Sequence, residues 1–528
     1  MDNKISNNKE VQSDKNVAVV EIDDQDSVFE PTGATMGPFR RRCIMLSLCL
    51  ALFLSALDVT IVATALPTIA KQINASTAEY AWIGSAYTLS STASVPIWAQ
   101  LSNIFGRKPI IMLANLSFLG GSLICGLAKS VGLLIGGRAV QGLGSGGCLI
   151  MVTVIIGDMF KVKDRAKYYG LTGIVWAISS SFGPVLGGVF TQTIGWRWCS
   201  LINVPFDGLS LVVLFFALKS QIKTIPMKTG LKSLDWIGSL LIIGGTVCFL
   251  YGLEVGASDQ RPWASAMVIC LLVFGLVILG LFAFYEARFA TNPLIPGRIL
   301  SSRTNCASII VLCLHSFVFI SYDYFLPLYF QAVLGFNAIV SGVCLLALVV
   351  PLSAFTMSTG WYVKRKGDYQ LPIWIGTCVM TLGTGLFISF GSGIDWPKII
   401  LFQIVVGMGA GPLFQSPMIA LQSHVKQVDI AAAMSASSFM RSLCSSMSIV
   451  IGSVLIQKSL HGGKLTIDSD VGDDKDADQT LSVENSTSAL SMMWIFYCAI
   501  CGVMTLVSIF IEKMPAQNLT VDHASEEP

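Results

Sequence analysis

Long apolar runs separated by short polar stretches dominate the chain from about residue 43 to residue 511. A helix of about 20 residues, at about 1.5 Å rise per residue, crosses the roughly 30 Å hydrocarbon core of a bilayer. The pattern therefore predicts fourteen membrane-spanning helices. Their expected limits are 43–67, 80–101, 109–128, 131–158, 166–193, 199–218, 234–254, 263–285, 305–330, 338–362, 371–391, 398–421, 430–457 and 489–511.

Composition supports an all-α polytopic membrane protein. Apolar residues make up 53% of the 528 residues and charged residues only 12%, about half of the charged fraction of a soluble domain. The first 38 residues are polar and mostly acidic, so residues 1–42 are expected to form a disordered cytoplasmic tail without a secretory signal peptide. Residues 513–528 form a second expected cytoplasmic tail. The net charge of +2 gives no indication of a nucleic-acid partner.

Positive charge is concentrated in alternate connections between the predicted spans. Twenty-one Lys and Arg residues lie after even-numbered spans, just before the first span or after the last, and 8 lie after odd-numbered spans. Lysine and arginine favour the cytoplasmic side of a membrane. Both termini are therefore expected in the cytoplasm.

Two glycosylation sequons agree with this orientation. Asn74-Ala-Ser76 and Asn485-Ser-Thr487 both lie in connections assigned to the outside. Asn485 is the better candidate, because Asn74 lies close to the membrane. The outer connection over 459–488 is acidic and rich in Gly, which predicts a flexible loop without a domain of its own.

The spacing of the spans predicts two halves and an insertion. The longest inner connections are 219–233 and 286–304, and they enclose one helical hairpin. An arrangement of six, two and six helices fits two repeated halves around a central path, a plan common among secondary transporters. The expected units are an N-terminal half over 43–219, a hairpin with linkers over 220–304 and a C-terminal half over 305–512.

Asp58 lies well inside the first predicted span, in the stretch Leu57-Asp-Val-Thr-Ile-Val-Ala-Thr-Ala-Leu-Pro67. A lone ionised carboxylate in the membrane costs at least a few kcal/mol, so it is expected to face protein or water and to be able to take up a proton. Such residues mark ion and substrate pathways. A structural aspartate that hydrogen-bonds a neighbouring helix is the alternative.

Further motifs follow in order along the chain. They are Ala99-Gln-Leu-Ser-Asn103-Ile-Phe-Gly106-Arg107-Lys108, Arg138-Ala-Val-Gln141-Gly142-Leu-Gly144, Gly173 with Gly183-Pro184-Val-Leu-Gly187-Gly188, Gly195-Trp-Arg197-Trp198, Ile202-Asn203-Val-Pro205 and Leu326-Pro327-Leu-Tyr329-Phe-Gln331. Together with the Asp58 stretch, they make residues 40–512 resemble the fourteen-helix drug:proton antiporter branch of the major facilitator superfamily. The chain looks like the fungal members that export drugs and toxins. The resemblance implies the major facilitator fold.

Gly106, Arg107 and Lys108 form a tight, charged turn on the cytoplasmic side. In the family this turn latches the two halves in one state of the access cycle. Asn103 stands where the family usually has Asp, so the latch is expected to be weaker or Asp164 to replace the missing carboxylate. A plain positively charged inner turn is the alternative.

Arg138 lies near the outer third of the fourth predicted span. A buried guanidinium stays charged and needs a carboxylate or several carbonyls. In the family the matching arginine is linked to proton transfer, so we assign Arg138 and Asp58 together to proton coupling. A purely structural, hydrogen-bonding arginine is the alternative.

The glycine-rich segments indicate close helix packing. Gly142-Leu-Gly144-Ser-Gly-Gly147 also matches a dinucleotide fingerprint, but no strand or βαβ unit surrounds it, so dinucleotide binding is rejected. Small residues let membrane helices approach closely. In the family, the residues matching Gly173, Gly183, Pro184, Gly187 and Gly188 form the antiporter signature, which favours exchange over uptake.

Other polar side chains mark a candidate substrate path. Asp323 lies between Tyr322 and Tyr324 in the ninth predicted span, where an acid beside aromatic rings suits a cationic or amphipathic substrate. A second proton site, or an acid solvated at the helix end, fits equally well. Asp207 and Tyr87 complete this set. His315 and Arg441 also lie within predicted spans.

These features predict a proton-coupled exporter of small lipophilic compounds. The expected substrates are a fungal secondary metabolite, antifungal drugs or both. The chain has no P-loop sequence to suggest ATP as the energy source. We expect no cofactor, and the four histidines are too dispersed for a metal cluster. No nucleophile triad is apparent, so an enzyme is not expected.

The expected partners are the substrate, protons and the lipid bilayer. We expect a monomer in the plasma membrane. The alternative is a vacuolar transporter of basic amino acids, or a siderophore transporter, of the same superfamily.

Overall fold

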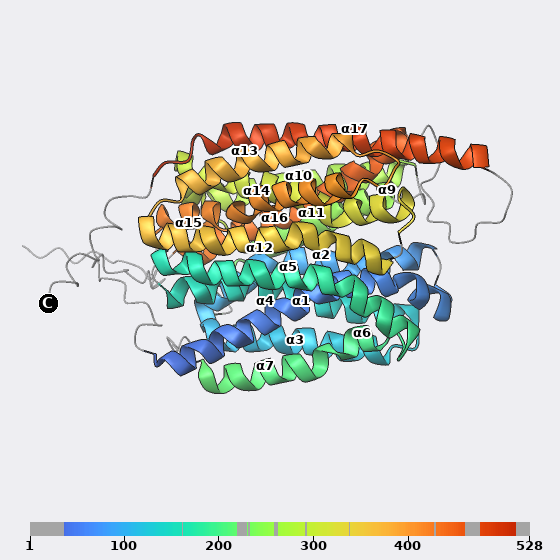
Figure 1. Ribbon diagram of the computed structural model, residues 1–528. Helices are drawn as coiled ribbons and strands as arrows, with labels where there is room; N and C mark the ends of the chain where they lie inside the picture. The colour runs from blue at the N-terminus through green and yellow to red at the C-terminus, as the bar shows by residue number, and fades with distance from the viewer. Residues whose placement is uncertain are drawn as a thin grey trace, which may run out of the picture.

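The computed structural model (Figure 1) describes residues 36–75, 77–160, 162–218, 230, 233–257, 262–290, 293–336, 338–426, 429–459 and 476–513. Its α-helices are α1 (Pro38–Gln72), α2 (Thr77–Phe105), α3 (Arg107–Leu127), α4 (Val131–Met159), α5 (Val162–Gln192), α6 (Trp198–Leu201), α7 (Asn203–Ala217), α9 (Trp236–Ala257), α10 (Ala266–Arg288), α11 (Arg303–Ala332), α12 (Ala338–Lys366), α13 (Gln370–Leu386), α14 (Trp396–Leu413), α15 (Ser416–Ser423), α16 (Ile430–Ser459) and α17 (Asp476–Ser508). Two short 3-10 helices are η1 (Gly297–Leu300) and η2 (Phe387–Ser389). The predicted tails before residue 36 and after residue 513, and the outer connection over 460–475, lie outside the described residues.

Thirteen helices within the described ranges are long and apolar enough to cross a membrane. The remaining predicted span, 80–101, is the second of the fourteen and corresponds to α2, which is 29 residues long but rich in Ser and Thr. Because of this composition, α2 is less apolar than the other spans. The helix nevertheless packs along α4 within the bundle. The all-α membrane fold is confirmed, and the chain is a multi-pass membrane protein.

Several helices extend beyond the predicted apolar limits. α1 begins at Pro38, five residues before the expected start, and proline suits the first turn of a helix because its missing N–H is not needed there. α17 begins at Asp476, so residues 476–488 are helical rather than part of the expected outer loop. Hydropathy marks the part of a helix that meets lipid. A formed helix also adds polar residues at little cost, because propagation is easier than nucleation.

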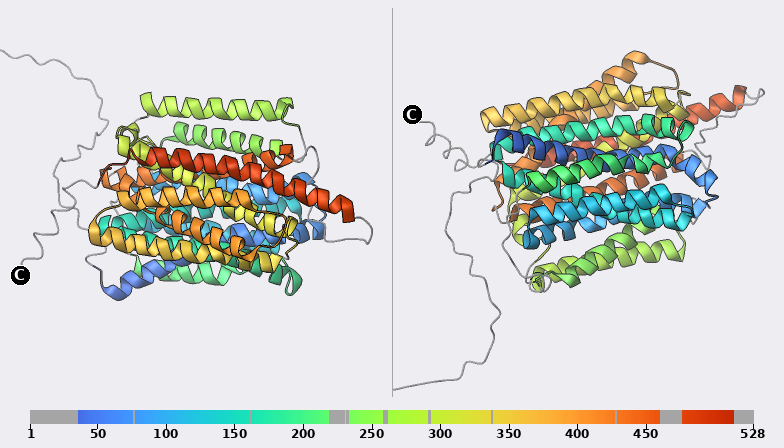
Figure 2. Two further views of the ribbon diagram at one scale, coloured as in Figure 1. Left: turned by 45° about the horizontal axis from the view of Figure 1, so that its top comes forward. Right: turned by 90° about the horizontal axis from the view of Figure 1, so that it is seen from below.

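The N-terminal helices α1–α7 and the C-terminal helices α11–α17 form two groups that lie side by side (Figure 1). They meet mainly where α12 runs along α5 and where α16 runs along α2. The hairpin of α9 and α10 lies at the edge of the bundle (Figure 2). Its helix α9 packs on both α2 and α16, so the hairpin covers one seam between the two groups. Trp82 of α2 contacts Tyr251 of α9 there, with ring centroids 4.7 Å apart.

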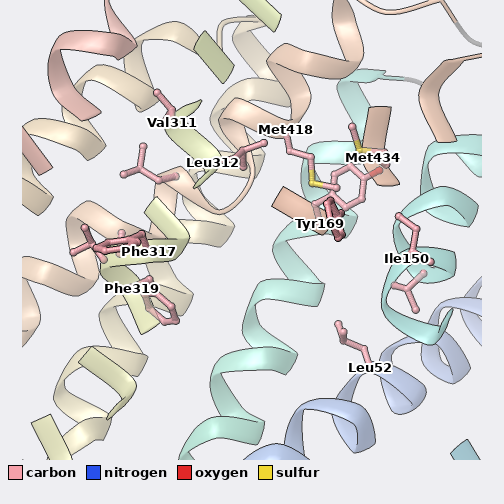
Figure 3. Packing of buried hydrophobic residues seen from close by; sticks show 14 of the residues in the cluster. Leu52, Ile150, Tyr169, Val311, Leu312, Phe317, Phe319, Met418 and Met434 are labelled. Atoms are coloured by element: carbon pink, nitrogen blue, oxygen red, sulfur yellow. The ribbon is translucent and has the colours of Figure 1, made fainter. Parts of the chain in front are cut away.

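One apolar core runs through both groups. Buried residues from α1, α4 and α5 belong to the same cluster as residues from α11, α15 and α16, as Figure 3 shows. Tyr169 of α5 and Met434 of α16 meet at Gln422 of α15, whose amide nitrogen lies 2.8 Å from the Tyr169 hydroxyl and 3.0 Å from the Met434 sulfur. The two groups are thus joined by both apolar and polar contacts.

Glycines position α4 between its neighbours, as the sequence predicts. A Cβ atom at Gly142 or Gly146 would overlap the backbone of α2, and one at Gly144 would overlap the backbone of α3 at Phe118. The small residues therefore serve helix packing, because any side chain at these positions would push the helices apart.

Candidate functional site

Asp58 of α1 and Arg138 of α4 form a buried ion pair. Asp58 is 1% exposed and Arg138 is 3% exposed. A guanidinium nitrogen of Arg138 contacts one carboxylate oxygen of Asp58. The structure thus brings together the two residues that the sequence analysis assigned to one role, although 80 residues separate them in the chain.

Two amide side chains complete the coordination of Asp58. Gln141 donates to Asp58 Oδ1 over 2.7 Å, and Asn203 of α7 donates to the same oxygen over 3.2 Å. Both amides also donate to the Ser122 hydroxyl of α3. The carboxylate therefore has a charged partner on one oxygen and two neutral donors on the other.

Arg138 is held from several sides at once. It donates to Gln141 Oε1 over 2.8 Å and to the Ile83 carbonyl of α2 over 3.2 Å. Its guanidinium carbon also lies 4.4 Å from the centroid of the Tyr87 ring, a cation–π contact. Removing one partner of a buried ion pair costs about 3–5 kcal/mol, because the other charge is left uncompensated.

Tyr87 lies within this cluster. It is 2% exposed, and its hydroxyl donates to the Ser55 carbonyl over 2.8 Å and lies 2.7 Å from the Ser145 hydroxyl. Tyr87 therefore connects α1, α2 and α4 beneath Arg138. That Tyr87 lies on a substrate path stays a prediction. In the structure, its ring contacts Arg138 of the ion pair.

The sequence analysis did not assign roles to Gln141, Asn203 and Ser122. A signal for Gln141 was present, because it follows Arg138 by three residues and so lies on the same face of α4. Asn203 was quoted only as part of a motif. Its approach to Asp58 depends on how α7 packs against α1 and α3, which the local pattern does not encode.

The turn between α2 and α3 has the predicted tight geometry. Gly106 has φ +91°, a conformation that favours glycine. Arg107 forms an ion pair with Asp158 at 2.6 Å and donates to Asn103 Oδ1 over 2.7 Å. Lys108 donates to the Phe215 carbonyl over 2.7 Å. Asn103 thus still accepts from Arg107, while the carboxylate of the network comes from Asp158.

Asp164 does not take the place of the missing family aspartate, which corrects that expectation. It instead forms an ion pair with Lys364 of α12 at 2.6 Å. Nearby, Arg165 of α5 donates to Gln422 of α15 over 2.9 Å. At the end of the bundle where α5 begins, the two helix groups are therefore joined by polar contacts, because the start of α5 faces α12 and α15 rather than the turn at Arg107.

The glycines of the predicted antiporter signature face different neighbours. A Cβ atom at Gly183 or Gly187 would overlap Thr60 or Thr64 of α1. One at Gly173 would lie 3.1 Å from a Thr356 methyl group of α12, and one at Gly188 would meet nothing within 4 Å. Gly183 and Gly187 bring α5 close to the helix that carries Asp58, and Gly173 faces the other helix group. The side chain of Pro184 lies outside what the structure describes.

The predicted path residues of α11 point in different directions. Tyr322 is fully buried and its hydroxyl contacts Thr384 of α13, whereas Tyr324 is 51% exposed. Asp323 is half-buried between them. Asp207 is fully buried, and its carboxylate oxygens have no hydrogen-bond partner among the described residues. It belongs to α7, at the edge of the bundle away from α11–α17 (Figure 1).

The two glycosylation candidates have different surroundings. Asn74 is exposed in the turn after α1, with φ +51°. Asn485 falls in the first part of α17, and its side chain lies outside what the structure describes. Within the described ranges, no three or more His, Cys, Asp or Glu side chains gather as they would around a metal ion.

Comparison with known proteins places these observations in a family. Residues 48–449 match the sequence description of the Major Facilitator Superfamily. The chain is 43% identical over 502 residues to a protein named "Efflux pump dotC" from Dothistroma septosporum, covering 92% of this chain and 86% of that protein. It is 35% identical over 431 residues to "Efflux pump FUS6" from Gibberella fujikuroi, covering 81% of this chain and 77% of that protein.

A solved structure has a similar fold. The proton:xylose symporter XylE superposes with a TM-score of 0.59 at 13% identity, covering 89% of this chain and 96% of that one. At this level of identity the likeness concerns the fold alone.

Proposed function

Because the chain belongs to the major facilitator superfamily, whose members are membrane transporters, we propose that it is a proton-coupled efflux transporter of small lipophilic compounds. Its substrates are a fungal secondary metabolite, antifungal drugs or both. Relatives named efflux pumps support the direction of transport. The observation that carries proton coupling is the buried Asp58–Arg138 pair.

Asp58 is the proton-binding group in this proposal. A proton from outside binds its carboxylate and removes the negative charge that compensates Arg138. Arg138 remains charged, since a guanidinium does not lose its proton in a protein. The energy of the buried network therefore changes by several kcal/mol between the two protonation states, because one buried charge loses its partner.

This change drives the conformational cycle. The protonated network favours one arrangement of α1 and α4 relative to the C-terminal helices, and release of the proton inside restores the ion pair. Gly183 and Gly187 transmit the movement of α1 to α5, because their contacts with Thr60 and Thr64 leave no space between the helices. α5 then acts on α12 through Gly173 and through the Asp164–Lys364 pair.

The helix organisation supports two moving units. Residues 43–219 and 305–512 form the two six-helix halves, and the hairpin within 220–304 is an insertion over the seam between α2 and α16. In this proposal Arg107, Lys108 and Asn103 form the cytoplasmic latch of the N-terminal half. Asp323, Tyr324 and Asp207 belong to the substrate path. The protein acts as a monomer in the plasma membrane, with both termini in the cytoplasm.

The test compares export by cells that express the wild type, Asp58→Asn or a control variant, Asp395→Asn, at matched surface levels. Asp395 suits as a control because it is a partly exposed aspartate outside the membrane network. Accumulation of lipophilic dyes, azoles and fungal metabolites is measured with and without a protonophore. We expect export by the wild type and by Asp395→Asn, its loss with the protonophore, and its loss in Asp58→Asn.

Two other results would change the proposal. Export that survives Asp58→Asn but is abolished by the protonophore would move proton coupling to Asp323 or Asp207. A vacuolar location, with uptake of basic amino acids and no export of any compound, would replace the efflux function with the vacuolar alternative.

A further inference from the structure

Arg441 of α16 is a membrane arginine without a counter-charge. It lies eleven residues after the start of α16 at Ile430, which places it near mid-membrane at about 1.5 Å per residue. Its Nε atom is buried without a hydrogen-bond partner among the described residues, and no ion pair joins Arg441 to an acid among them; Cys313 of α11 is an electrostatic neighbour. A charged group in this position is costly unless something compensates it.

The side chain of Arg441 faces α11. Arg441, Ser445 and Ser448 are spaced by four and three residues, so they share one face of α16. The Ser445 hydroxyl lies 2.9 Å from the Ser316 hydroxyl of α11, and Ser448 donates to the Phe317 carbonyl of the same helix. Arg441 therefore lies one helical turn from a direct contact with α11, inside the bundle rather than toward lipid.

His315 precedes this contact on α11 and is an electrostatic neighbour of Arg441. It is fully buried; it makes a polar contact with the backbone of Ala410 in α14, and neither ring nitrogen forms a hydrogen bond of good geometry with a described residue. A buried polar group without a partner costs about 1–3 kcal/mol. An uncompensated cation and a poorly hydrogen-bonded imidazole thus lie near each other in the C-terminal helices.

Aromatic rings flank His315. The His315 ring lies 5.8 Å from Phe319, nearly parallel to it, and 4.9 Å from Phe414, at a steep angle. Phe414 lies in the break between α14, which ends at Leu413, and α15, which begins at Ser416. Interrupted membrane helices are tolerated where the backbone is buried in protein or lines a cavity. The surroundings combine a positive charge, an imidazole ring and a flat apolar surface.

We propose that Arg441 and His315, with Phe414 and Phe319, bind the anionic group of an aromatic organic acid, so that the substrate itself supplies the missing counter-charge. A carboxylate or a phenolate can accept two hydrogen bonds from one guanidinium. The aromatic body of the ligand packs on the phenylalanine rings. This inference rests on the proposed transport function and names a substrate class for it: aromatic acids rather than cations.

Binding to purified protein tests the site separately from transport. Calorimetric titration in detergent uses 2-naphthoate and 1-hydroxy-2-naphthoate as anionic probes, and methyl 2-naphthoate as the neutral probe of similar shape. Wild type is compared with Arg441→Gln, Arg441→Lys and the control Arg303→Gln. Arg303 is an exposed arginine at the start of α11, outside the proposed site.

We expect the wild type and Arg303→Gln to bind the anions at least about tenfold more tightly than the ester, a difference of about 1.4 kcal/mol. Arg441→Gln loses this preference, and Arg441→Lys keeps part of it, because lysine has the charge but not the two-pronged geometry. Equal anion binding by Arg441→Gln and wild type would overturn the site. So would equal binding of the ester and the anions, or no anion binding by the wild type up to the solubility limit.

Thermal unfolding of the same samples separates a structural role from a binding role. If Arg441 binds a ligand, Arg441→Gln unfolds at the same or a higher temperature than the wild type without probe, and 2-naphthoate stabilises the wild type and Arg303→Gln but not Arg441→Gln. A lower unfolding temperature of Arg441→Gln without probe, with no stabilisation of the wild type by 2-naphthoate, indicates a structural arginine and rejects the site. If no compound is exported but anion selectivity is found, the site stands and the efflux function fails. Export of neutral compounds without anion selectivity gives the reverse conclusion.

Discussion

Two arginines lie inside membrane helices, and their surroundings differ sharply. Arg138 contacts the carboxylate of Asp58, the amide of Gln141 and a backbone carbonyl, whereas Arg441 has no such partner among the described residues. The first arginine is compensated within the fold of the N-terminal helices. The second keeps an unmatched charge in the C-terminal helices. The comparison contrasts a closed ionic network in one half with an uncompensated charge in the other, where we propose the ligand site.

The largest expected difference in stability is between the glutamine variants of the two arginines, Arg138 and Arg441. Arg138→Gln leaves the buried carboxylate of Asp58 without its counter-charge and is expected to lower the free energy of unfolding by about 3–5 kcal/mol. Arg441→Gln removes a charge that nothing compensates, so it is expected to leave stability unchanged or to raise it. Unfolding of purified protein in detergent, followed by circular dichroism, measures both. Equal losses in the two variants would contradict the comparison.

A second pair of variants compares two buried glutamines, one inside the Asp58–Arg138 network and one outside it. Gln141→Leu removes a donor to Asp58 and an acceptor for Arg138, and hydrogen bonds to charged groups contribute about 1.5–3 kcal/mol. Gln403→Leu in α14 is the matched control. Among the described residues, the buried amide of Gln403 bonds only a backbone carbonyl of its own helix, and its oxygen has no partner. Only Gln141→Leu is expected to lower stability and proton-coupled export, and a comparable loss in Gln403→Leu would argue against a special network.

A smaller loss of stability is expected from a substitution in α4, the helix that carries Arg138. Gly144→Ala would press a methyl group onto the backbone of Phe118 in α3, and overpacking of this kind costs about 1–3 kcal/mol. Gly136→Ala on the same helix meets nothing within 4 Å and should be neutral or stabilising by up to about 1 kcal/mol. The difference between the two unfolding midpoints checks the prediction. A neutral Gly144→Ala would mean that α4 can shift without disturbing the ion pair.

Much of the fold followed from the alternation of apolar and polar segments. Thirteen helices of the described residues have the length and apolarity to cross a membrane. The exceptions are informative. α2 is too rich in Ser and Thr to resemble the other spans, and α17 begins before its apolar run. In both cases hydropathy describes contact with lipid, whereas the helix itself depends on backbone hydrogen bonds and on packing with neighbours.

The candidate site was predicted unevenly. Asp58 and Arg138 could be assigned together because a membrane acid and a membrane arginine both need a partner. Asp158 was not recognised as the carboxylate that pairs with Arg107; a weaker latch, or Asp164 in place of the missing carboxylate, was expected instead. Asp158 and Asp164 both lie near the turn between α4 and α5. The direction in which each side chain leaves its helix decides which one reaches the arginine.

The sequence by itself determined which segments cross the membrane as helices. It also showed which buried charges need a partner and which glycines permit close helix packing. Only the tertiary structure decided which groups share a partner. Asn203 reaches Asp58 from 145 residues away, whereas Arg441 reaches no acid among the described residues. The physical reason is that hydropathy depends on one residue and its solvent, whereas pairing depends on the rotation and depth of two helices packed against each other.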